Sequence, residues 1–386
     1  MGVFDPDALV EQARAQTGLD DFGADGWQPG LAAFCAALES EAQLNDLGRA
    51  AVPTQIVGAL ANRLKIVDWA RRHPEVTARP VDVSLVVVGM FRGGTTFLSQ
   101  LLDQDRRSRS LLRWESADPV PPPTRQEWRS GPRVDAAAAA AEMMEHVNPG
   151  FKRIHHDPAD GPTECVTLLA HDFKSLLWPT VTNVPSYTEW LYGVDETTAY
   201  EYHHLALQVL QSGGVPGPWT LKSPHHMIAL PELAARYPGS CLVITHRDPA
   251  VLAASVCSLI TSLAGTFTDA DHRAQIARTW PRLLEVCIDR LGAFRAHHPD
   301  VEIVDVHYAD LVGDPVGTVE RIYARAGMEL DDATRTALTG YVAAHPRGEF
   351  GAHQYDFASF GLDEGELRER FADYVDRYAI PAESPE

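Results

Sequence analysis

The chain has 386 residues, of which 45% are hydrophobic and 22% are charged, and its formal net charge at pH 7 is −20. This length and composition are typical of a folded globular protein with a sizeable core, which excludes a chain that is disordered throughout. The negative charge repels phosphate backbones, so we expect no nucleic-acid partner. An acidic protein that binds an anionic ligand must gather cations at the binding site. Each Lys or Arg within a motif is therefore a candidate contact to such a ligand.

The cysteines and the N-terminus bear on the cellular compartment. The five cysteines are scattered and form no CxxC pair, which favours reduced, buried thiols. Residues 1–7 lack the basic and apolar segments of a signal peptide, and no apolar run reaches the length of a membrane span. These features predict a cytoplasmic protein without stable membrane insertion, and they leave its oligomeric state open.

The first 80 residues have the apolar spacing of helices, and Pro74 and Pro80 end this pattern. The spacing predicts helices over 7–15, 31–47 and 55–72. We therefore treat 1–80 as a helical N-terminal region.

From residue 81 onward, short apolar runs alternate with helical spacing. The run 83–88 is typical of a strand that is buried on both faces of a parallel sheet. Further strands are expected at 219–222, 241–246 and 301–307, and helices at 95–103, 228–237, 249–263, 272–297 and 315–327. This alternation predicts an α/β domain over 81–386, with three layers around a central parallel sheet.

The first strand leads directly into a GxxxxG phosphate-binding loop (P-loop) that opens a helix, the context that this motif requires. The loop consists of Gly89, Met90, Phe91, Arg92, Gly93, Gly94, Thr95 and Thr96. Its glycines let backbone N–H groups converge on an anion, and the helix N-terminus adds its positive dipole end. An ATP-binding loop has Lys where this chain has Thr95, and here the cation is Arg92, within the loop. Such a loop suits a phosphate with a neighbouring anionic group, without a metal ion.

The run from Arg92 to Thr96 resembles the R/K-S-G-T-T loop of sulfotransferases that use 3′-phosphoadenosine-5′-phosphosulfate (PAPS). In that family the loop binds the 5′-phosphosulfate. Gly93 stands where the family usually has Ser, which leaves only the backbone amide at that position. The resemblance implies PAPS as the donor, adenosine 3′,5′-bisphosphate as the product, and a small-molecule acceptor, as in the bacterial members of the family.

Two further segments resemble the 3′-phosphate site of the same family. Arg247 ends a predicted strand, and Ser255 follows eight residues later in the next helix, about two turns on, so both can face one ligand. Arg347 and Gly348 begin a run that resembles the basic-Gly-x-x-Gly loop that closes over the 3′-phosphate. The resemblance therefore extends from about residue 83 to the C-terminus.

Sulfuryl transfer needs cations for the developing charge and a base for the acceptor proton. Arg92 and Lys222 are the candidate cations, and Lys222 is one of only four lysines in the chain. The candidate bases are Glu115, which resembles the glutamate base of the protein- and glycan-directed sulfotransferases, and His226, whose neighbour His225 could replace it. Glu164 is a third candidate.

Metal chemistry is not expected, because the adjacent histidine doublets cannot converge on one ion and no HExxH motif is present. Two other functions remain as alternatives. A P-loop kinase of small molecules would need Lys after Gly94, which is absent. A non-catalytic nucleotide-binding module would use the helical N-terminal region to recruit a partner. The sequence does not identify the acceptor.

Overall fold

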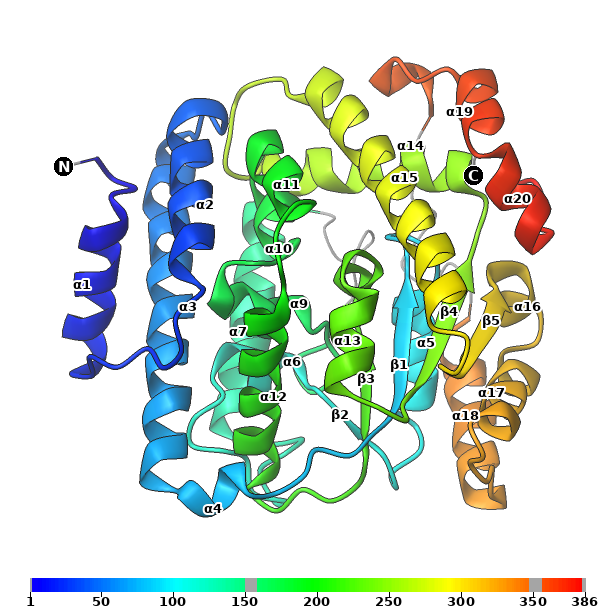
Figure 1. Cartoon of the computed structure of the whole chain (residues 1–386), viewed down its shortest axis with the longest axis horizontal. Helices are drawn as coiled ribbons and strands as arrows, with labels where there is room; N and C mark the ends of the chain where they lie inside the picture. Colours follow the sequence, from blue (N-terminus) through cyan, green and yellow to red (C-terminus); the bar gives the residue numbers. More distant parts are fainter. Residues whose placement is uncertain (1, 150–157, 347–355, 384–386) are drawn as a thin grey trace.

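The centre of the fold is a five-stranded sheet in which all strands are parallel, in the order β2-β3-β1-β4-β5 (Figure 1). The computed structural model describes residues 2–149, 158–346 and 356–383. The strands are β1 (Val83–Gly89), β2 (Arg109–Ser110), β3 (Trp219–Lys222), β4 (Cys241–His246) and β5 (Ile303–His307). The predicted α/β fold with a central parallel sheet is therefore confirmed.

Helices cover both faces of this sheet and form a separate N-terminal layer. In the first half of the chain they are α1 (Pro6–Thr17), α2 (Gln28–Glu41), α3 (Asp46–Arg72), α4 (Pro74–Thr77), α5 (Thr95–Leu102), α6 (Arg113–Ala117), α7 (Pro132–Val147), α9 (Val166–Leu169), η1 (Ala170–Asp172), α10 (Leu177–Val181) and α11 (Pro185–Leu191). In the second half they are α12 (Thr197–Gln211), η2 (Pro224–Ile228), α13 (Leu230–Arg236), α14 (Pro249–Ala264), α15 (Arg273–His297), α16 (Tyr308–Gly313), α17 (Pro315–Arg325), α18 (Asp332–Ala344), η3 (Ala358–Phe360), α19 (Glu364–Arg370) and α20 (Ala372–Tyr378). Across the described residues, no helix combines the length and the apolar character that crossing a membrane requires.

Strand β1 is buried on both faces, as its β-branched run predicts. Leu85 and Val87 face a hydrophobic cluster that includes residues of α5, α17 and α18, whereas Val86 and Val88 belong to the larger core with α12 to α15. This alternation follows from the two-residue period of a strand. The strand is thus held rigidly from both sides, and so is the loop that follows it.

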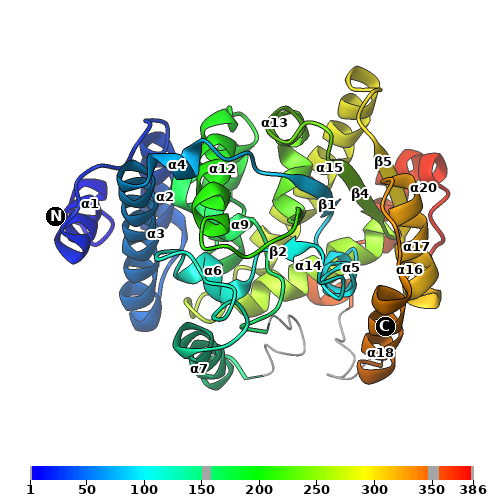
Figure 2. The same ribbon diagram turned by 90° about the horizontal axis from the view of Figure 1, so that it is seen from below.

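The helical N-terminal region packs on α11, α12 and η1. Helix α12 lies between α3 and the sheet in both views (Figures 1 and 2). The buried guanidinium of Arg63 in α3 forms an ion pair of 2.7 Å with Asp172 of η1, and it also donates to the carbonyl oxygen of Phe22. One hydrophobic core runs from α1 to α20. The change from helices to sheet near residue 80 therefore leaves the core unbroken, and the division into two domains stays a prediction.

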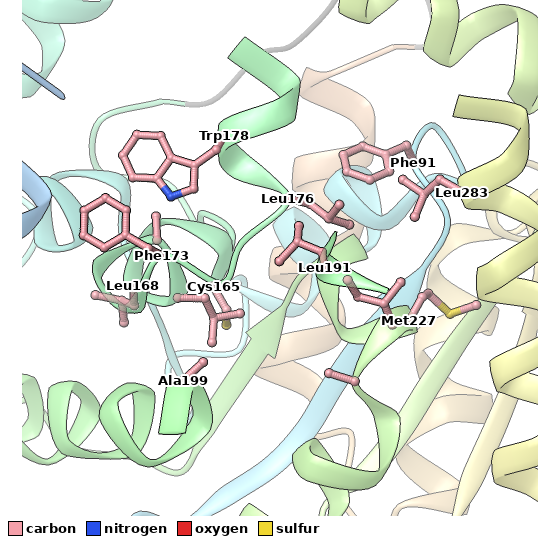
Figure 3. Close-up of a cluster of buried hydrophobic side chains, with 14 of the residues drawn as sticks. Phe91, Cys165, Leu168, Phe173, Leu176, Trp178, Leu191, Ala199, Met227 and Leu283 are labelled. Atoms are coloured by element: carbon pink, nitrogen blue, oxygen red, sulfur yellow. The ribbon is translucent and has the colours of Figure 1, made fainter. Parts of the chain in front are cut away.

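The segment that joins α9 to α10 rests on a buried cluster of side chains (Figure 3). The rings of Phe173 and Trp178 stack with their centroids 5.5 Å apart, and Cys165 and Leu168 are buried beside them. Burial raises the pKa of the Cys165 thiol to about 12, so this cysteine acts as a neutral core residue. The cluster gives the residues around 164–177 a firm support.

Candidate active site

A cavity of about 790 Å³ lies where the carboxyl ends of the central strands meet. After β1 the chain forms β2 and β3 on one side of β1, and then β4 and β5 on its other side. Ligands bind at such switch points in open α/β sheets. The parallel register pairs Val87 with Lys222 and Gly89 with Thr245. Residues that follow β1, β3 and β4 are therefore brought to the same edge, although they are far apart in sequence.

The P-loop forms one wall of the cavity, through Arg92, Gly94, Thr95 and Thr96. Arg92 and Gly94 both have positive φ values, 68° and 88°, and the N–H of Gly93 donates to the carbonyl oxygen of Met90 at 3.0 Å. A Cβ atom at Gly93 would lie only 2.9 Å from that oxygen. The tight turn thus favours glycine where the resemblance would place Ser, and it leads into the N-terminus of α5.

The predicted 3′-phosphate residues contact the P-loop directly. Arg92 Nε donates to Ser255 Oγ at 3.1 Å, and Arg247 Nη1 donates to the carbonyl oxygen of Arg92 at 3.1 Å. The Arg247 guanidinium also lies 4.0 Å from the ring centroid of Tyr308. The structure therefore brings Arg92, Arg247 and Ser255 into one cluster of polar groups.

Lys222 and Glu164 form an ion pair of 2.9 Å at the end of β3. Glu164 lines the cavity, whereas the Lys222 side chain is only 3% exposed and lies behind it. The N–H of Cys165 donates to the carbonyl oxygen of Lys222 at 2.9 Å, which joins the Glu164 segment to the strand. The backbone thus holds this carboxylate and this ammonium group against each other.

Glu115 points into the core, outside the cavity lining that the described residues form. Its carboxylate pairs with Arg109 Nη2 at 2.6 Å and accepts from the N–H of Leu112 at 2.9 Å, with both charged side chains fully buried. Its helix neighbours Arg113 and Ser116 do line the cavity. The turn of α6 therefore directs Glu115 away from the site and into a structural ion pair.

His226 and His225 are also fully buried and lie outside this lining. His226 Nδ1 and the Tyr200 hydroxyl are hydrogen-bonded at 2.7 Å, and burial lowers the pKa of His226 well below its usual value of 6.5. His225 Nδ1 accepts from the N–H of Leu176 at 3.2 Å, so its Nε2–H donates to Glu196 at 2.5 Å. Both imidazoles are held within the core by these contacts.

The remaining predicted residues, Arg347 and Gly348, lie outside the described residues. Pro346, which directly precedes them, lines the cavity together with Tyr341 and His345. Over the ranges that the structure describes, no group of three or more His, Cys, Asp or Glu side chains is arranged to hold a metal ion.

The sequence analysis missed two features of the cavity. Tyr308 follows directly after β5, and its place at a strand end is a signal that would have identified it. The second feature is an apolar wall of the cavity, built from α10, α14 and their neighbours. Its residues are Leu176, Leu177, Val181, Leu259, Leu263 and Phe267. No local pattern distinguishes these residues from ordinary core positions.

Comparisons with known proteins show the family and the fold of the chain. Residues 84–332 match the family model described as "Sulfotransferase family". The crystal structure of sulfotransferase STF9 from Mycobacterium avium is similar at 31% identity, with a TM-score of 0.89, over 98% of this chain and 97% of that one. Sulfotransferase STF1 from Mycobacterium tuberculosis H37Rv is similar at 32% identity, with a TM-score of 0.84, over 95% and 98%. A curated relative, the omega-hydroxy-beta-dihydromenaquinone-9 sulfotransferase Stf3 of Mycobacterium bovis, is 24% identical over 334 residues, or 83% of this chain and 81% of Stf3.

Proposed function

The chain belongs to the sulfotransferase family, and we propose that it transfers a sulfuryl group from PAPS to a hydroxyl or amine of a small molecule. The transfer proceeds by in-line displacement without a metal ion. The observation that carries this proposal is the direct contact of Arg92 with Ser255 and of Arg247 with the Arg92 carbonyl oxygen, at a cavity that Glu164 also lines. We expect the enzyme to act in the cytoplasm.

The donor is bound through its two anionic ends. The 5′-phosphosulfate takes the N–H groups at the start of α5 together with Arg92, Thr95 and Thr96. The 3′-phosphate takes Arg247 and Ser255, and Arg347 and Gly348 are proposed to complete this end. The contacts between Arg92, Arg247 and Ser255 support a single ligand that spans both positions.

In the reaction, the acceptor oxygen or nitrogen attacks sulfur and forms a new bond to it. The bond between sulfur and the bridging oxygen breaks, and adenosine 3′,5′-bisphosphate leaves with the electron pair. Arg92 and the N-terminus of α5 stabilise the charge that develops on the leaving phosphate. Lys222 supplies positive charge from behind Glu164, 2.9 Å from its carboxylate.

We propose Glu164 as the base that accepts the acceptor proton. A base must come within hydrogen-bond reach of that proton, and Glu164 is the candidate carboxylate that lines the cavity. The burial of Glu115 in its ion pair with Arg109, and the burial of His226 against Tyr200, argue against both of them. The third candidate of the sequence analysis is therefore preferred over the other two in this proposal.

The acceptor is proposed to carry its hydroxyl or amine on an apolar body. The wall formed by α10 and α14 is apolar, and it lines the same cavity as Glu164. The relative Stf3 takes its name from a lipid-like alcohol of this kind, an omega-hydroxy dihydromenaquinone. Apolar walls with a few polar groups are typical of small-molecule sites.

Thermal denaturation tests the donor assignment. Adenosine 3′,5′-bisphosphate should raise the Tm in the absence of magnesium, and adenosine 5′-phosphate should raise it much less, because it lacks the anion that Arg247 binds. Arg247→Ala should remove most of this difference, whereas Arg335→Ala, at an exposed ion pair with Glu320, should keep it. Equal shifts from the two nucleotides would contradict the proposal, and magnesium-dependent stabilisation by ATP would favour a kinase. Binding without turnover, across a panel of alcohols and amines with labelled PAPS, would favour a non-catalytic module.

A further inference from the structure

The segment that follows α20 contacts Arg247, which lines the cavity. Glu383 accepts from Arg247 Nε at 3.0 Å through Oε2 and at 3.2 Å through Oε1, and Oε2 lies 2.9 Å from Nη2. The Arg247 side chain is 8% exposed and that of Glu383 is 27% exposed, so water screens the pair only in part. A residue at the end of the chain therefore holds the arginine that we assign to the 3′-phosphate.

The two sides of this guanidinium have different partners. Nη1 donates to the carbonyl oxygen of Arg92, and the plane of the group lies over the Tyr308 ring. Glu383 occupies the edge formed by Nε and Nη2. This is an edge with which arginine binds a carboxylate or a phosphate through two parallel hydrogen bonds. The Glu383 carboxylate thus takes the position of an anionic ligand.

The contacts around Glu383 allow its side chain to leave without loosening the rest of the site. Ile380 is buried and anchors the segment, while the N–H of Glu383 donates to Asp248 Oδ2 at 2.9 Å. That Asp248 carboxylate also accepts from Arg368 at 2.9 Å and from the N–H of Ala250 at 3.0 Å, as the cap of α14. Because Asp248 contacts the Glu383 backbone, it keeps all three partners when the Glu383 side chain moves.

We propose that Glu383 is a built-in competitor for the 3′-phosphate site. The carboxylate and a 3′-phosphate cannot both occupy the same edge of Arg247, so PAPS must displace Glu383 to bind. After transfer and release of the product adenosine 3′,5′-bisphosphate, the returning carboxylate occupies the vacated edge and opposes rebinding of the product. Nucleotides without a 3′-phosphate leave the pair intact and are not affected. This inference rests on the proposed function, since it assumes that Arg247 binds the 3′-phosphate.

Isothermal titration calorimetry of the full chain with adenosine 3′,5′-bisphosphate tests the competition. Glu383→Gln should tighten the Kd about tenfold, because the neutral amide competes less well than a charge-assisted pair. The matched control is Glu364→Gln, which removes a carboxylate from the same C-terminal region but contacts Arg368 and not Arg247. It should bind as the wild type does. Adenosine 5′-phosphate should bind all three proteins with similar affinity.

A stopped-flow measurement of nucleotide association gives a second readout. The association rate constant of Glu383→Gln should rise by a similar factor, since the nucleotide no longer has to wait for the charged carboxylate to leave Arg247. A melting curve of each variant verifies that it is folded.

Failure of the competition is distinguishable from failure of the proposed function. If Arg247→Ala weakens binding but Glu383→Gln matches Glu364→Gln, the competition is refuted and the 3′-phosphate site stands. Weaker binding by Glu383→Gln would show that Glu383 orients Arg247, which also overturns the proposal. If the wild type does not bind the nucleotide, or if Arg247→Ala binds it equally well, the proposed function fails and the competition fails with it.

Discussion

Two sets of polar side chains lie near the carboxyl end of β3, and they differ in their surroundings. The cavity-side set consists of Arg92, Glu164 and Arg247, which line the cavity, together with Lys222, which is buried behind Glu164 and paired with it. The buried set consists of Glu115, His203, His225 and His226, which are fully enclosed in the core. Each set contains residues that qualify as catalytic by their chemical type alone.

The difference arises from the path of the chain over a few residues. Lys222 and His226 are only four positions apart, but η2 begins at Pro224 and turns His226 toward Tyr200 in the core. A buried histidine avoids charge because the core cannot solvate the imidazolium, so its pKa falls. Closeness to a motif in sequence is therefore a poor guide to whether a side chain can meet a substrate.

The largest difference between the two sets is expected in turnover. Glu164→Gln should lower the turnover number by roughly 10²–10⁴-fold, because the variant cannot accept the acceptor proton. His226→Asn should retain turnover within a few-fold, since its ring does not reach the cavity. Steady-state kinetics with PAPS and an acceptor found by screening would measure both.

Nucleotide binding is the control for this pair of variants. Both should bind adenosine 3′,5′-bisphosphate as the wild type does, because neither residue belongs to the proposed phosphate contacts. An active Glu164→Gln enzyme, or an inactive but folded His226→Asn enzyme, would reverse the assignment of the two sets.

A smaller effect, on stability, is expected for the buried ion pair. Glu115→Gln should lower the free energy of unfolding by about 3 kcal/mol, because it leaves Arg109 buried without its counter-charge. Turnover per folded molecule should stay near that of the wild type. Chemical denaturation and single-point activity would test both statements.

Glu201→Gln is the matched control for the buried pair. Its partner Arg236 lies 3.4 Å away, and the two side chains are 32% and 49% exposed, so water screens the pair. Its loss should cost less than about 1 kcal/mol. Similar costs for the two variants, or a large loss of turnover in Glu115→Gln, would remove the distinction between the buried and the cavity-side carboxylates.

The smallest effect concerns the pH dependence of stability. Burial lowers the pKa of His203 to about 3 and the pKa of His226 well below 6.5, so both are neutral in the folded protein. In the unfolded chain they gain protons below about pH 6.5, which favours unfolding. The contribution of these two neutral histidines to the free energy of unfolding is complete above that pH. It is lost as the pH falls, at about 1.4 kcal/mol per pH unit for each histidine.

Urea denaturation between pH 7.5 and 5 would measure the slope of the free energy of unfolding against pH. His226→Asn should make the slope shallower by about 1 kcal/mol per pH unit, whereas His297→Asn should leave it unchanged, because His297 is exposed. An unchanged slope in His226→Asn would mean that this histidine is not the neutral core residue described above.

The sequence alone predicted the residues of the proposed phosphate-binding side of the site. The loop at Arg92 and the spacing of Arg247 and Ser255 are local features, in which a few neighbouring residues set the backbone path. The alternation of strands and helices then predicted the parallel sheet that brings these segments to one edge. These predictions needed only short-range periodicity and the rule that parallel strands end at the same side of a sheet.

The tertiary structure alone decided which carboxylates face the cavity. Glu115 lies shortly after β2 in the sequence and Glu164 lies far from any strand, but packing of α6 buries the first while the second lines the cavity. Glu383 reaches Arg247 across 136 positions of the chain. The exposure of a side chain depends on elements that are remote in sequence, and no local pattern encodes which of them will cover it.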